Sequence, residues 1–318
     1  MKISYLPGKY SQQRQRERAA NIYPVHLAME ATYYAQKGHE VHWGRAVGKY
    51  DKVVYAPEGI LFLALPKPDR KLTDCHNAYY QRNGNFKKRP GTYIQSAVGC
   101  WHGKCTFCVE KEKRWEVRPL GSVLQEIDEC HDLGFREIFD DSATFPVGDW
   151  LGGFCKWARK DLTYGCNMRM VDVDYAMMKK AGFRMLLFGL ESANQDTLDR
   201  IQKGTSVRDV KYIIHAANCG LEPHIAVMFG CPGETDKDSI NTLKLVHSLL
   251  RKGYAKTAQA SFYNAVGVRS ESQRKYVRRI YEAAYYPDFW FNQLKDIKNM
   301  DDIKYLWLKI KKGIGFCE

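Results

Sequence analysis

The stretch MKKAGFRMLLFGLES, residues 178–192, decides the fold. It joins the end of a helical pattern at 178–181 to a glycine, Gly182, and then to a run rich in apolar residues at 184–190. A glycine directly after a helix can take the left-handed conformation that ends the helix. The run that follows has the length and the large apolar side chains of a buried strand. The stretch therefore predicts a helix, a glycine cap and a buried strand, in that order.

The same order of helix end, glycine and strand recurs through the middle of the chain. It is found in CHDLGFREIFDD from residue 130, AANCGLEPHIAVMFG from 216 and LLRKGYAKTAQASFY from 249. Two further strand-like runs, TYIQSAVG at 92–99 and DLTYGCNM at 161–168, bring the total to about six strand–helix units. Strands that alternate with helices predict a parallel sheet covered by helices, and right-handed crossovers let such units curl into a barrel. We therefore predict an α/β fold built on a partial (β/α)6 barrel.

The segments on either side of this region have a different pattern. MKISYL at the start, DKVVYA at 51–56 and ILFLAL at 60–65 are predicted strands, and a helix from about Pro24 to Gly38 is followed by another strand. These elements make a small, incomplete βαβ-like unit, which the basic linker RNGNFKKRPGT at 82–92 joins to the barrel. Beyond residue 265 the sequence predicts a basic, aromatic-rich helical extension. The predicted domains are residues 1–90, 91–265 and 266–318.

The composition is that of a globular protein. The chain has 318 residues, of which 45% are hydrophobic and 27% charged. It contains no run of about 18 apolar residues and no signal-peptide pattern, so we predict a cytoplasmic protein that does not enter a membrane. In a reducing compartment, the ten cysteines favour metal binding or catalysis over disulfide bonds.

The net charge of +13 is unevenly distributed. Residues 1–99 hold 16 Lys and Arg against 7 Asp and Glu, residues 100–250 hold 19 against 22, and residues 251–318 hold 14 against 7. Basic flanks around a nearly neutral centre are typical of solvated helix faces, or of a protein with an acidic partner. In the second case they favour nucleic acid or an acidic or nucleotide-like substrate. The sequence contains no named nucleic-acid-binding motif.

Three clustered cysteines give the strongest chemical signal. In GCWHGKCTFC, residues 99–108, Cys100, Cys105 and Cys108 follow the first predicted barrel strand, at the end where parallel α/β folds place their chemistry. Thiolates are soft ligands that suit zinc or an iron–sulfur cluster. Zinc would require a fourth ligand, for which His102 inside the loop is a candidate, but the chain has no second C-x2-C pair. A cluster normally takes four thiolates, so three thiolates favour a cluster with one iron open to another ligand.

Polar residues follow the other predicted strands and so fall at the same edge of the sheet. They are Asp140 and Asp141 after the second strand, Arg169 after the third, and Glu191 with Ser192 after the fourth. Each has an alternative structural role: Asp141 or Ser142 could cap a helix, the Glu191–Ser192 pair could start one, and Arg169 could be solvated or salt-bridged. Lys203 could reach the site or end a helix, whereas Cys166 and Cys231 are predicted to pack in the core.

The motifs at these successive strand ends resemble those of radical S-adenosylmethionine enzymes, over roughly residues 92–265. The closest resemblance is to the branch that often carries an N-terminal cobalamin-binding domain. It implies that Cys100, Cys105 and Cys108 hold a 4Fe-4S cluster whose fourth iron is chelated by the amino and carboxylate groups of S-adenosylmethionine. It also implies a reducing partner such as flavodoxin or ferredoxin. The spacing here is C-x4-C-x2-C, one residue longer than the usual C-x3-C-x2-C.

The resemblance further implies a binding role for residues at five strand ends. Phe107 would lie beside the adenine, and Asp140 and Asp141 would bind the methionine amino group. Arg169 would lie near the ligand carboxylate or the substrate. Glu191 and Ser192 would hold the ribose or the methionine part, and the backbone from Val227 to Gly230 would contact adenine.

Cobalamin is not expected, although PVHLAMEATYYAQKGHEVHW resembles part of the associated cobalamin-binding domain. That domain usually ligates cobalt through a D-x-H-x-x-G loop, and here Asp74 and His76 are followed by Tyr79 where the glycine should be. The segment also comes after the predicted strands, in a unit that is short for such a domain. Methylthio transfer is disfavoured as well, because it requires three further N-terminal cysteines and residues 1–99 contain only Cys75.

The sequence thus leads to a radical S-adenosylmethionine enzyme that makes a 5′-deoxyadenosyl radical and abstracts a substrate hydrogen. Two alternatives remain open, a cobalamin-dependent methylase of the same family and a basic nucleic-acid-binding protein with a structural metal site. Neither the substrate nor the final reaction is predicted.

Overall fold

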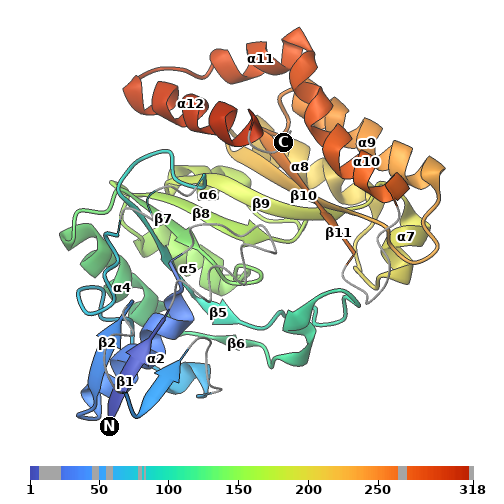
Figure 1. The fold of residues 1–318 in the computed structure, drawn as a ribbon. Helices are drawn as coiled ribbons and strands as arrows, with labels where there is room; N and C mark the ends of the chain where they lie inside the picture. Colours follow the sequence, from blue (N-terminus) through green and yellow to red (C-terminus); the bar gives the residue numbers. More distant parts are fainter. Residues whose placement is uncertain are drawn as a thin grey trace.

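The protein contains two α/β units and a helical C-terminal region (Figure 1). The computed structural model describes residues 1–6, 23–44, 50–54, 60–77, 81, 84–263 and 271–314. The larger unit has a six-stranded sheet in the order β11-β10-β9-β8-β7-β4, in which all neighbouring strands are parallel. Its strands are β4 (Gly91–Ile94), β7 (Glu137–Asp140), β8 (Thr163–Met168), β9 (Phe183–Glu191), β10 (Glu222–Phe229) and β11 (Thr257–Phe262).

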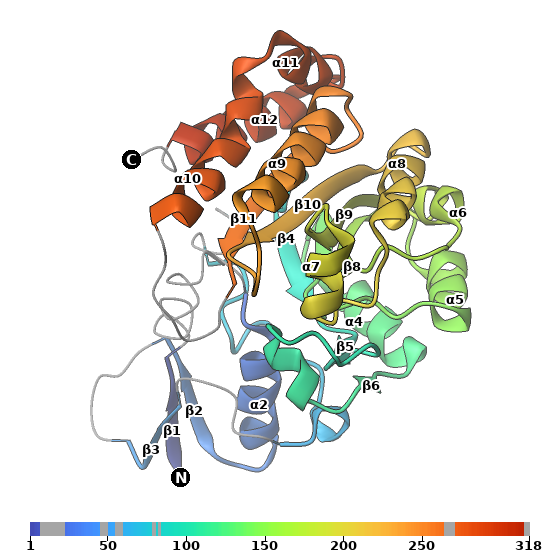
Figure 2. The same ribbon diagram turned by 90° about the vertical axis from the view of Figure 1, so that its right-hand side faces the viewer.

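Helices connect consecutive strands and cover the outer side of the curved sheet (Figure 2). They are α4 (Leu120–Asp132), α5 (Asp149–Trp157), α6 (Tyr175–Lys180), α7 (Gln195–Arg200), α8 (Val210–Asn218), α9 (Asp236–Arg251) and the 3₁₀ turn η3 (Val207–Asp209). Strands β4 and β11 stand at opposite ends of the sheet and do not pair with each other, so the barrel is open. This architecture confirms the predicted partial (β/α)6 barrel.

The repeated glycines end helices as expected. Gly134, Gly182, Gly220 and Gly253 have φ angles of +83°, +103°, +82° and +76°, a left-handed conformation that costs other residues free energy. Burial is most complete in β7, where every residue is buried, and in β9, where seven of nine residues are buried, whereas β11 at the sheet edge has a single buried residue. Strands covered by helices read as almost continuous apolar runs, which is why the stretch at 178–192 identifies the fold.

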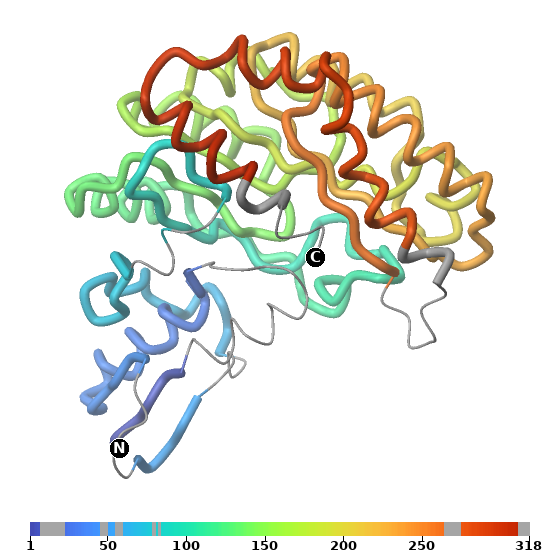
Figure 3. Tube along the Cα trace, turned by 45° about the horizontal axis from the view of Figure 1, so that its top comes forward, coloured from blue at the N-terminus to red at the C-terminus, as the bar shows by residue number. Residues whose placement is uncertain are grey.

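The smaller unit lies at the amino end of the chain. It is a parallel sheet in the order β2-β1-β3, formed by β1 (Lys2–Tyr5), β2 (Glu40–Trp43) and β3 (Lys52–Val54), with α2 (Val25–Gln36) packed on it. Its own small core consists of Ile3, Tyr5, Leu27, Ala31 and Val54. The unit and the C-terminal helices lie on opposite sides of the barrel (Figure 3). The domain boundaries after residues 90 and 265 stay predictions.

Two predicted strands were wrong in part. ILFLAL contains a 3₁₀ turn, η1 (Phe62–Ala64), because its buried side chains, Phe62 and Leu65, are three residues apart, which suits a 3₁₀ turn and not a strand. The first barrel strand ends at Ile94, and residues 97–98 form the separate short strand β5 (Ala97–Val98). It pairs antiparallel with β6 (Glu116–Val117). The cysteine loop therefore lies within a hairpin that projects from the carboxyl end of β4.

A buried ion triad fastens this hairpin to the barrel. Glu126 on α4 accepts hydrogen bonds from Arg70 and Arg118, and the three side chains are at most 5% exposed. The Arg118 backbone N–H donates to the Ser96 carbonyl oxygen at 2.9 Å. Removing one member of such a triad would leave a buried charge unpaired, which is costly, so the entry and exit of the hairpin are firmly held.

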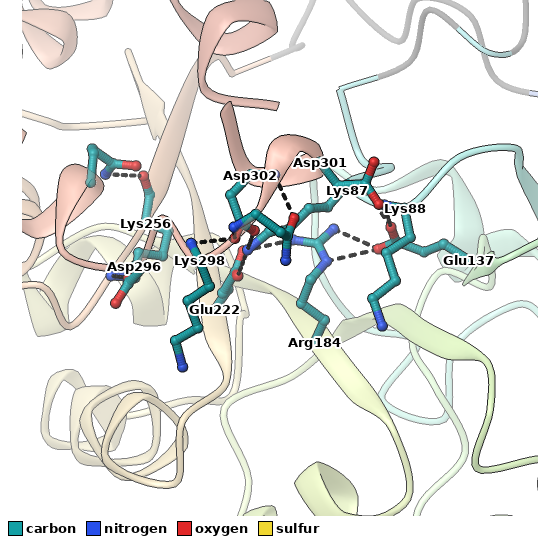
Figure 4. Close-up of polar contacts among 12 residues, drawn as sticks. Lys87, Lys88, Glu137, Arg184, Glu222, Lys256, Asp296, Lys298, Asp301 and Asp302 are labelled. Carbon is teal, nitrogen blue, oxygen red and sulfur yellow. Dashed lines mark hydrogen bonds and ion pairs between the residues drawn. The ribbon is translucent and has the colours of Figure 1, made fainter. Parts of the chain in front are cut away.

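The C-terminal helices pack on the barrel, and the last of them lies at the amino ends of the strands. They are α10 (Glu271–Arg279), η4 (Ile280–Tyr285), α11 (Pro287–Leu294) and α12 (Met300–Ile314). Figure 4 shows how α12 enters an ion network at the start of the strands, where Arg184 binds Glu137 and Glu222, and Lys87 binds Glu222 and Asp302. This end of the barrel is thereby occupied by protein. None of the helices in the described ranges combines the length and apolar character needed to span a bilayer.

The predicted basic linker is part of this network. The backbone N–H groups of Lys87 and Lys88 donate to Glu137 Oε2 at 2.6 and 2.7 Å, and Phe86 is completely buried. These contacts hold residues 86–88 against the base of the barrel, so this stretch does not behave as a free connection.

Candidate functional site

The carboxyl ends of the strands bring most of the predicted site residues to one edge of the sheet. The cysteine hairpin follows β4, Arg169 follows β8, and Glu191 ends β9. The segment after α7, residues 201–205, returns to the same edge and contacts all three. The site is therefore built from loops on a rigid sheet, the usual arrangement in parallel α/β proteins.

The three cysteines share one region of this edge. Cys105 is buried, whereas Cys100 and Cys108 are half-buried. Burial raises the pKa of the Cys105 thiol, and the positive charges of Lys203 and Arg169 oppose that rise. Burial also raises the pKa of Cys108, with further contributions from Cys105 and Cys100. Within the described ranges, no three His, Cys, Asp or Glu side chains are grouped closely enough to form a metal site.

The chemistry of this region fits an anionic, thiolate-bound group. Thiolates are the form in which cysteines bind metals, and nearby cations favour that form. Lys203 and Arg169 supply two buried cations next to Cys105. Within the described part of the chain, Arg169 Nε and Thr205 Oγ1 are buried polar atoms without a hydrogen-bond partner. The Arg169 Nε–H could therefore donate to an anionic group bound beside Cys105.

Glu191 lies in a strained turn at the end of β9. Its φ angle is +60°, and the Ser192 N–H donates to the Leu190 carbonyl oxygen at 2.8 Å. This hydrogen bond closes a three-residue γ-turn, which with a positive central φ is the rare, strained form. The pairing of β10 with β9 shifts at the same place, from Ala226–Gly189 to Val227–Glu191. Strain and bulges concentrate at functional sites, and here they aim the Glu191 side chain.

A buried ion pair fixes that side chain. Lys203 Nζ lies 2.7 Å from Glu191 Oε1, and the side chains are 8% and 9% exposed. Gly189 makes room for the pair, because a Cβ there would stand 2.5 Å from Glu191 Oε1 and 2.7 Å from Lys203 Nζ. The open question about Lys203 is thus resolved: it reaches the site.

Phe107 lies against the same lysine. Lys203 Nζ is 5.7 Å from the centre of the Phe107 ring, and the ring packs on a small apolar cluster formed by Leu198, Ile201, Met228 and Cys231. Its neighbour Thr106 donates its N–H to the Ile201 carbonyl oxygen at 3.0 Å. The Thr106 and Tyr263 hydroxyls are also 3.0 Å apart. Phe107 and the β10 end, both predicted to contact adenine, therefore lie side by side.

Asp140 and Asp141 differ in their surroundings. Asp140 is 3% exposed, and its carboxylate accepts hydrogen bonds from the Ser96 N–H and hydroxyl and from the Ser142 N–H. Burial raises the pKa of Asp140, and these hydrogen bonds oppose the rise. Asp141 is half-buried, and its N–H donates to the Ile94 carbonyl oxygen. Neither Asp141 nor Ser142 caps a helix, because α5 begins at Asp149 after Gly148.

Ser192 and Gly230 make hydrogen bonds within the loops that follow β9 and β10. The Ser192 hydroxyl lies 3.3 Å from the Thr242 hydroxyl and accepts the Asn194 N–H at 3.2 Å. Gly230 has a φ of +82°, and the Glu234 carboxylate accepts the N–H groups of Gly230 and Cys231 at 2.6 and 2.8 Å. Val227, 1% exposed, is part of the barrel core. Glu234 is therefore a positioning residue for the end of β10.

The His102 side chain, considered above as a metal ligand, makes a hydrogen bond to the protein backbone. Its Nε2 donates to the Gln202 carbonyl oxygen at 2.8 Å, since a carbonyl oxygen can only accept. Burial lowers the pKa of His102, so the ring is neutral at neutral pH.

Arg169 Nη2 donates to the Lys203 carbonyl oxygen at 2.6 Å, and its guanidinium lies 5.0 Å from the centre of the Trp101 ring. Sequence reasoning missed Trp101, Gln202 and Tyr263, because their roles depend on contacts between distant segments.

Comparison with known proteins gives the family. Residues 94–246 match the Radical SAM superfamily. The chain contains a radical S-adenosylmethionine domain. The matched range begins at the end of β4 and includes the three cysteines, Arg169 and Glu191. The family implies a 4Fe-4S cluster and S-adenosylmethionine as cofactors.

Three curated relatives are named for different activities. An uncharacterized methyltransferase of Pyrococcus horikoshii is 25% identical over 172 residues, covering 50% of this chain and 37% of the relative. A threonylcarbamoyladenosine tRNA methylthiotransferase of Thermotoga maritima is 24% identical, covering 54% and 44%. An anaerobic magnesium-protoporphyrin IX monomethyl ester cyclase of Rubrivivax gelatinosus is 26% identical, covering 44% and 28%. The chain thus spans less than half the length of these relatives.

Solved structures of radical S-adenosylmethionine enzymes also resemble the chain. The methyltransferase TsrM of Kitasatospora setae has a TM-score of 0.49 at 20% identity, covering 58% of this chain and 37% of TsrM. Coproporphyrinogen III oxidase of Escherichia coli has a TM-score of 0.48 at 15% identity, covering 65% and 55%.

Proposed function

We propose that the protein is a radical S-adenosylmethionine enzyme whose cluster is held by Cys100, Cys105 and Cys108. The observation that carries the proposal is that Cys105 lies beside the buried cations Arg169 and Lys203, within the range that matches this family. When bound, such a cluster supplies one electron to S-adenosylmethionine, whose C5′–S bond breaks to give methionine and a 5′-deoxyadenosyl radical that abstracts a substrate hydrogen.

The chain's own residues would bind and orient the co-substrate. Phe107 and the β10 end provide an apolar surface beside the cysteine loop, suited to an adenine ring. Glu191, held in place by Lys203, presents a carboxylate that can accept ribose hydroxyls. Arg169 offers an unpaired Nε–H, a donor suited to the methionine carboxylate. Asp141 remains our candidate for the methionine amino group, because it is half-buried at the end of β7, whereas Asp140 is 3% exposed and binds Ser96 and Ser142.

Anaerobic reconstitution tests the class directly. The protein should take up iron and sulfide and, with S-adenosylmethionine and dithionite, form 5′-deoxyadenosine without any added substrate. Replacing Cys100, Cys105 and Cys108 together by Ala should abolish both results. The matched control is Cys219→Ala, a half-buried thiol at the end of α8. A 4Fe-4S spectrum in the triple variant would refute the ligand assignment.

The nucleic-acid-binding alternative makes the opposite prediction. A structural metal site would bind metal without cleaving S-adenosylmethionine, and nucleic-acid affinity would fall steeply with salt. The same preparation therefore distinguishes the two functions.

We also propose that the protein does not use cobalamin. The His76 ring lies flat on Phe135, with centroids 4.4 Å apart and an angle of 3° between the planes, so the only histidine of the D-x-H-x-x-G-like segment packs against the barrel. Tyr79 lies outside the described residues. Corrinoid absorbance in protein purified from cells supplied with cobalamin would overturn this proposal and favour the cobalamin-dependent methylase.

An external reductant is expected, and the cysteine hairpin carries exposed cations that suit an acidic one. Lys104, Lys111 and Arg114 are exposed around the half-buried thiols, whereas Lys113 is paired with Glu110 at 2.6 Å and Glu112 is exposed beside them. An acidic flavodoxin or ferredoxin would associate faster with this surface at low salt. The rate of 5′-deoxyadenosine formation should therefore fall with salt when flavodoxin is the reductant, and change little with dithionite.

A further inference from the structure

The long cysteine loop rests on one short segment of the chain. Residues 201–204 follow α7 and meet the loop at three points. The Ile201 carbonyl oxygen accepts the Thr106 N–H at 3.0 Å, and the Gln202 carbonyl oxygen accepts His102 Nε2 at 2.8 Å. The Lys203 carbonyl oxygen accepts Arg169 Nη2 at 2.6 Å, and the Arg169 guanidinium stacks on Trp101. Three consecutive carbonyl groups thus hold the loop, two directly and one through Arg169.

The backbone of residues 201–204 has an unusual conformation at two positions. Gln202 and Gly204 have φ angles of +52° and +63°. For Gln202 this conformation is strained, and it turns successive carbonyl groups toward the loop. A Cβ on Gly204 would overlap His102 Cε1 and would stand 3.0 Å from His102 Nε2. The imidazole ring therefore occupies the space that any side chain at position 204 would need.

These contacts account for the additional residue in the C-x4-C spacing. Of the four residues between Cys100 and Cys105, Trp101 and His102 are each anchored to the body of the protein. Gly103, with a φ of +59°, then continues the chain in a left-handed conformation that suits glycine. The loop is longer than usual in the family, and it is immobilised by side chains that it carries itself.

We propose that residues 201–204 are a docking template for the cysteine loop, with His102 and Gly204 as a matched pair of positioning residues. The template sets the exposure and placement of Cys105, and couples the loop to Glu191 because Lys203 belongs to both contacts. That the docked thiols receive a cluster rests on the proposed function. The docking itself is a property of the chain without cofactor.

Gly204→Ala tests the template, and Gly134→Ala is its control. Both glycines have a positive φ, but a Cβ at Gly134 would meet nothing within 4 Å. The two variants therefore share the backbone strain, and only Gly204→Ala displaces His102. The first measurement is the rate at which iodoacetamide alkylates Cys105 in the apo-protein, followed by peptide mass spectrometry. We expect Gly204→Ala to raise this rate about tenfold, because losing a packed, hydrogen-bonded contact shifts a local opening equilibrium by that order.

The second measurement is the iron and sulfide content after anaerobic reconstitution. Residues that orient metal ligands typically contribute about 10- to 100-fold to affinity, so Gly204→Ala should bind the cluster at least about tenfold more weakly and change its electron paramagnetic resonance spectrum. His102→Ala should have a similar effect, and Gly204→Ala should add little to it, because residues in contact are not additive.

The outcomes separate the two proposals. Equal alkylation rates in the wild-type protein, Gly134→Ala and Gly204→Ala would overturn the template. A second, full-sized effect of Gly204→Ala in the His102→Ala background would overturn the matched pair. If the wild-type protein takes up no cluster, the proposed function fails, and the alkylation rates still decide whether the template exists.

Discussion

Lys203 Nζ lies 2.7 Å from Glu191 Oε1, at the carboxyl end of β9, and both side chains are less than a tenth exposed. Burying two charges is costly unless they are paired. The pair joins the strained turn at Glu191 to the segment that holds the cysteine loop. The contact therefore links the proposed cluster site to the proposed nucleoside site.

Lys203→Met should destabilise the protein strongly. The substitution leaves the Glu191 carboxylate buried without its partner, which typically costs about 3–5 kcal/mol. The double variant with Glu191→Gln should recover part of that loss, because no unpaired charge remains. Urea unfolding of the apo-protein measures both. Arg251→Met is the control, because its pair with Asp288 is about half exposed and contributes less than about 1 kcal/mol. Equal losses for Lys203→Met and Arg251→Met would contradict the prediction.

Gly189→Ala should lower affinity for S-adenosylmethionine. The added methyl group would displace the Glu191–Lys203 pair, and Gly189 has no positive φ to add backbone strain. We expect at least about a tenfold loss, as for other changes that move a ligand-orienting residue. Gly152→Ala in α5 is the control, because its Cβ would meet nothing within 4 Å and it should be neutral or stabilising. Equilibrium dialysis of the reconstituted proteins gives the two affinities.

The sequence was sufficient for the barrel because strands such as β7 and β9 are buried along almost their whole length. The apolar runs and the glycines at 134, 182, 220 and 253 locate the units without any knowledge of their partners. The sequence pattern fails to predict a strand end that is set by hydrogen bonds to residues far away in the sequence. The first strand breaks after Ile94 because the Asp140 carboxylate and the Ser142 hydroxyl bind the backbone of Ser96 and Ala97, which no local pattern reveals.

The candidate site was predictable only at its strand ends. Arg169 and Glu191 follow strands, so parallel topology places them at one edge. Lys203 and Glu234 act through loops that return to this edge, and Trp101 and His102 act through a segment about one hundred residues later in the sequence, as the contact between His102 and Gln202 shows. Such contacts depend on tertiary structure, because the segment 201–204 has no composition that marks it as a binding surface.

Substitutions of Asp140 and Asp141 should distinguish a structural role from a ligand-binding role. Asp140→Asn should destabilise the protein by about 1–3 kcal/mol, because the amide cannot accept all three hydrogen bonds and leaves a buried donor unsatisfied. Asp141→Asn should change stability less and weaken S-adenosylmethionine binding, because it removes the charge proposed to face the amino group. Urea unfolding and equilibrium dialysis measure the two effects. Unchanged affinity in Asp141→Asn, with lost affinity in a folded Asp140→Asn, would reverse the assignment.

Low pH should destabilise the amino-terminal end of the barrel, because it protonates Glu222. Burial alone would raise the pKa of Glu222, but Arg184, Lys309 and Lys87 outweigh it and lower the pKa to about 2. A carboxyl group whose pKa is lower in the folded state stabilises the fold above its unfolded pKa, and that stabilisation is lost as pH falls toward the folded pKa.

The stabilisation by Glu222 should therefore be complete above about pH 5 and should decline between about pH 4.5 and pH 2. Glu222→Gln should be less stable than the wild-type protein near neutral pH, by about 3 kcal/mol, and the difference should shrink as the wild-type carboxylate is protonated. Urea midpoints of both proteins across this range test the prediction. Asp288→Asn is the control, because Asp288 lies in a half-exposed pair and should show no such convergence. A difference that stays constant down to about pH 3 would show that the ionised carboxylate of Glu222 does not hold α12 and the strand ends together.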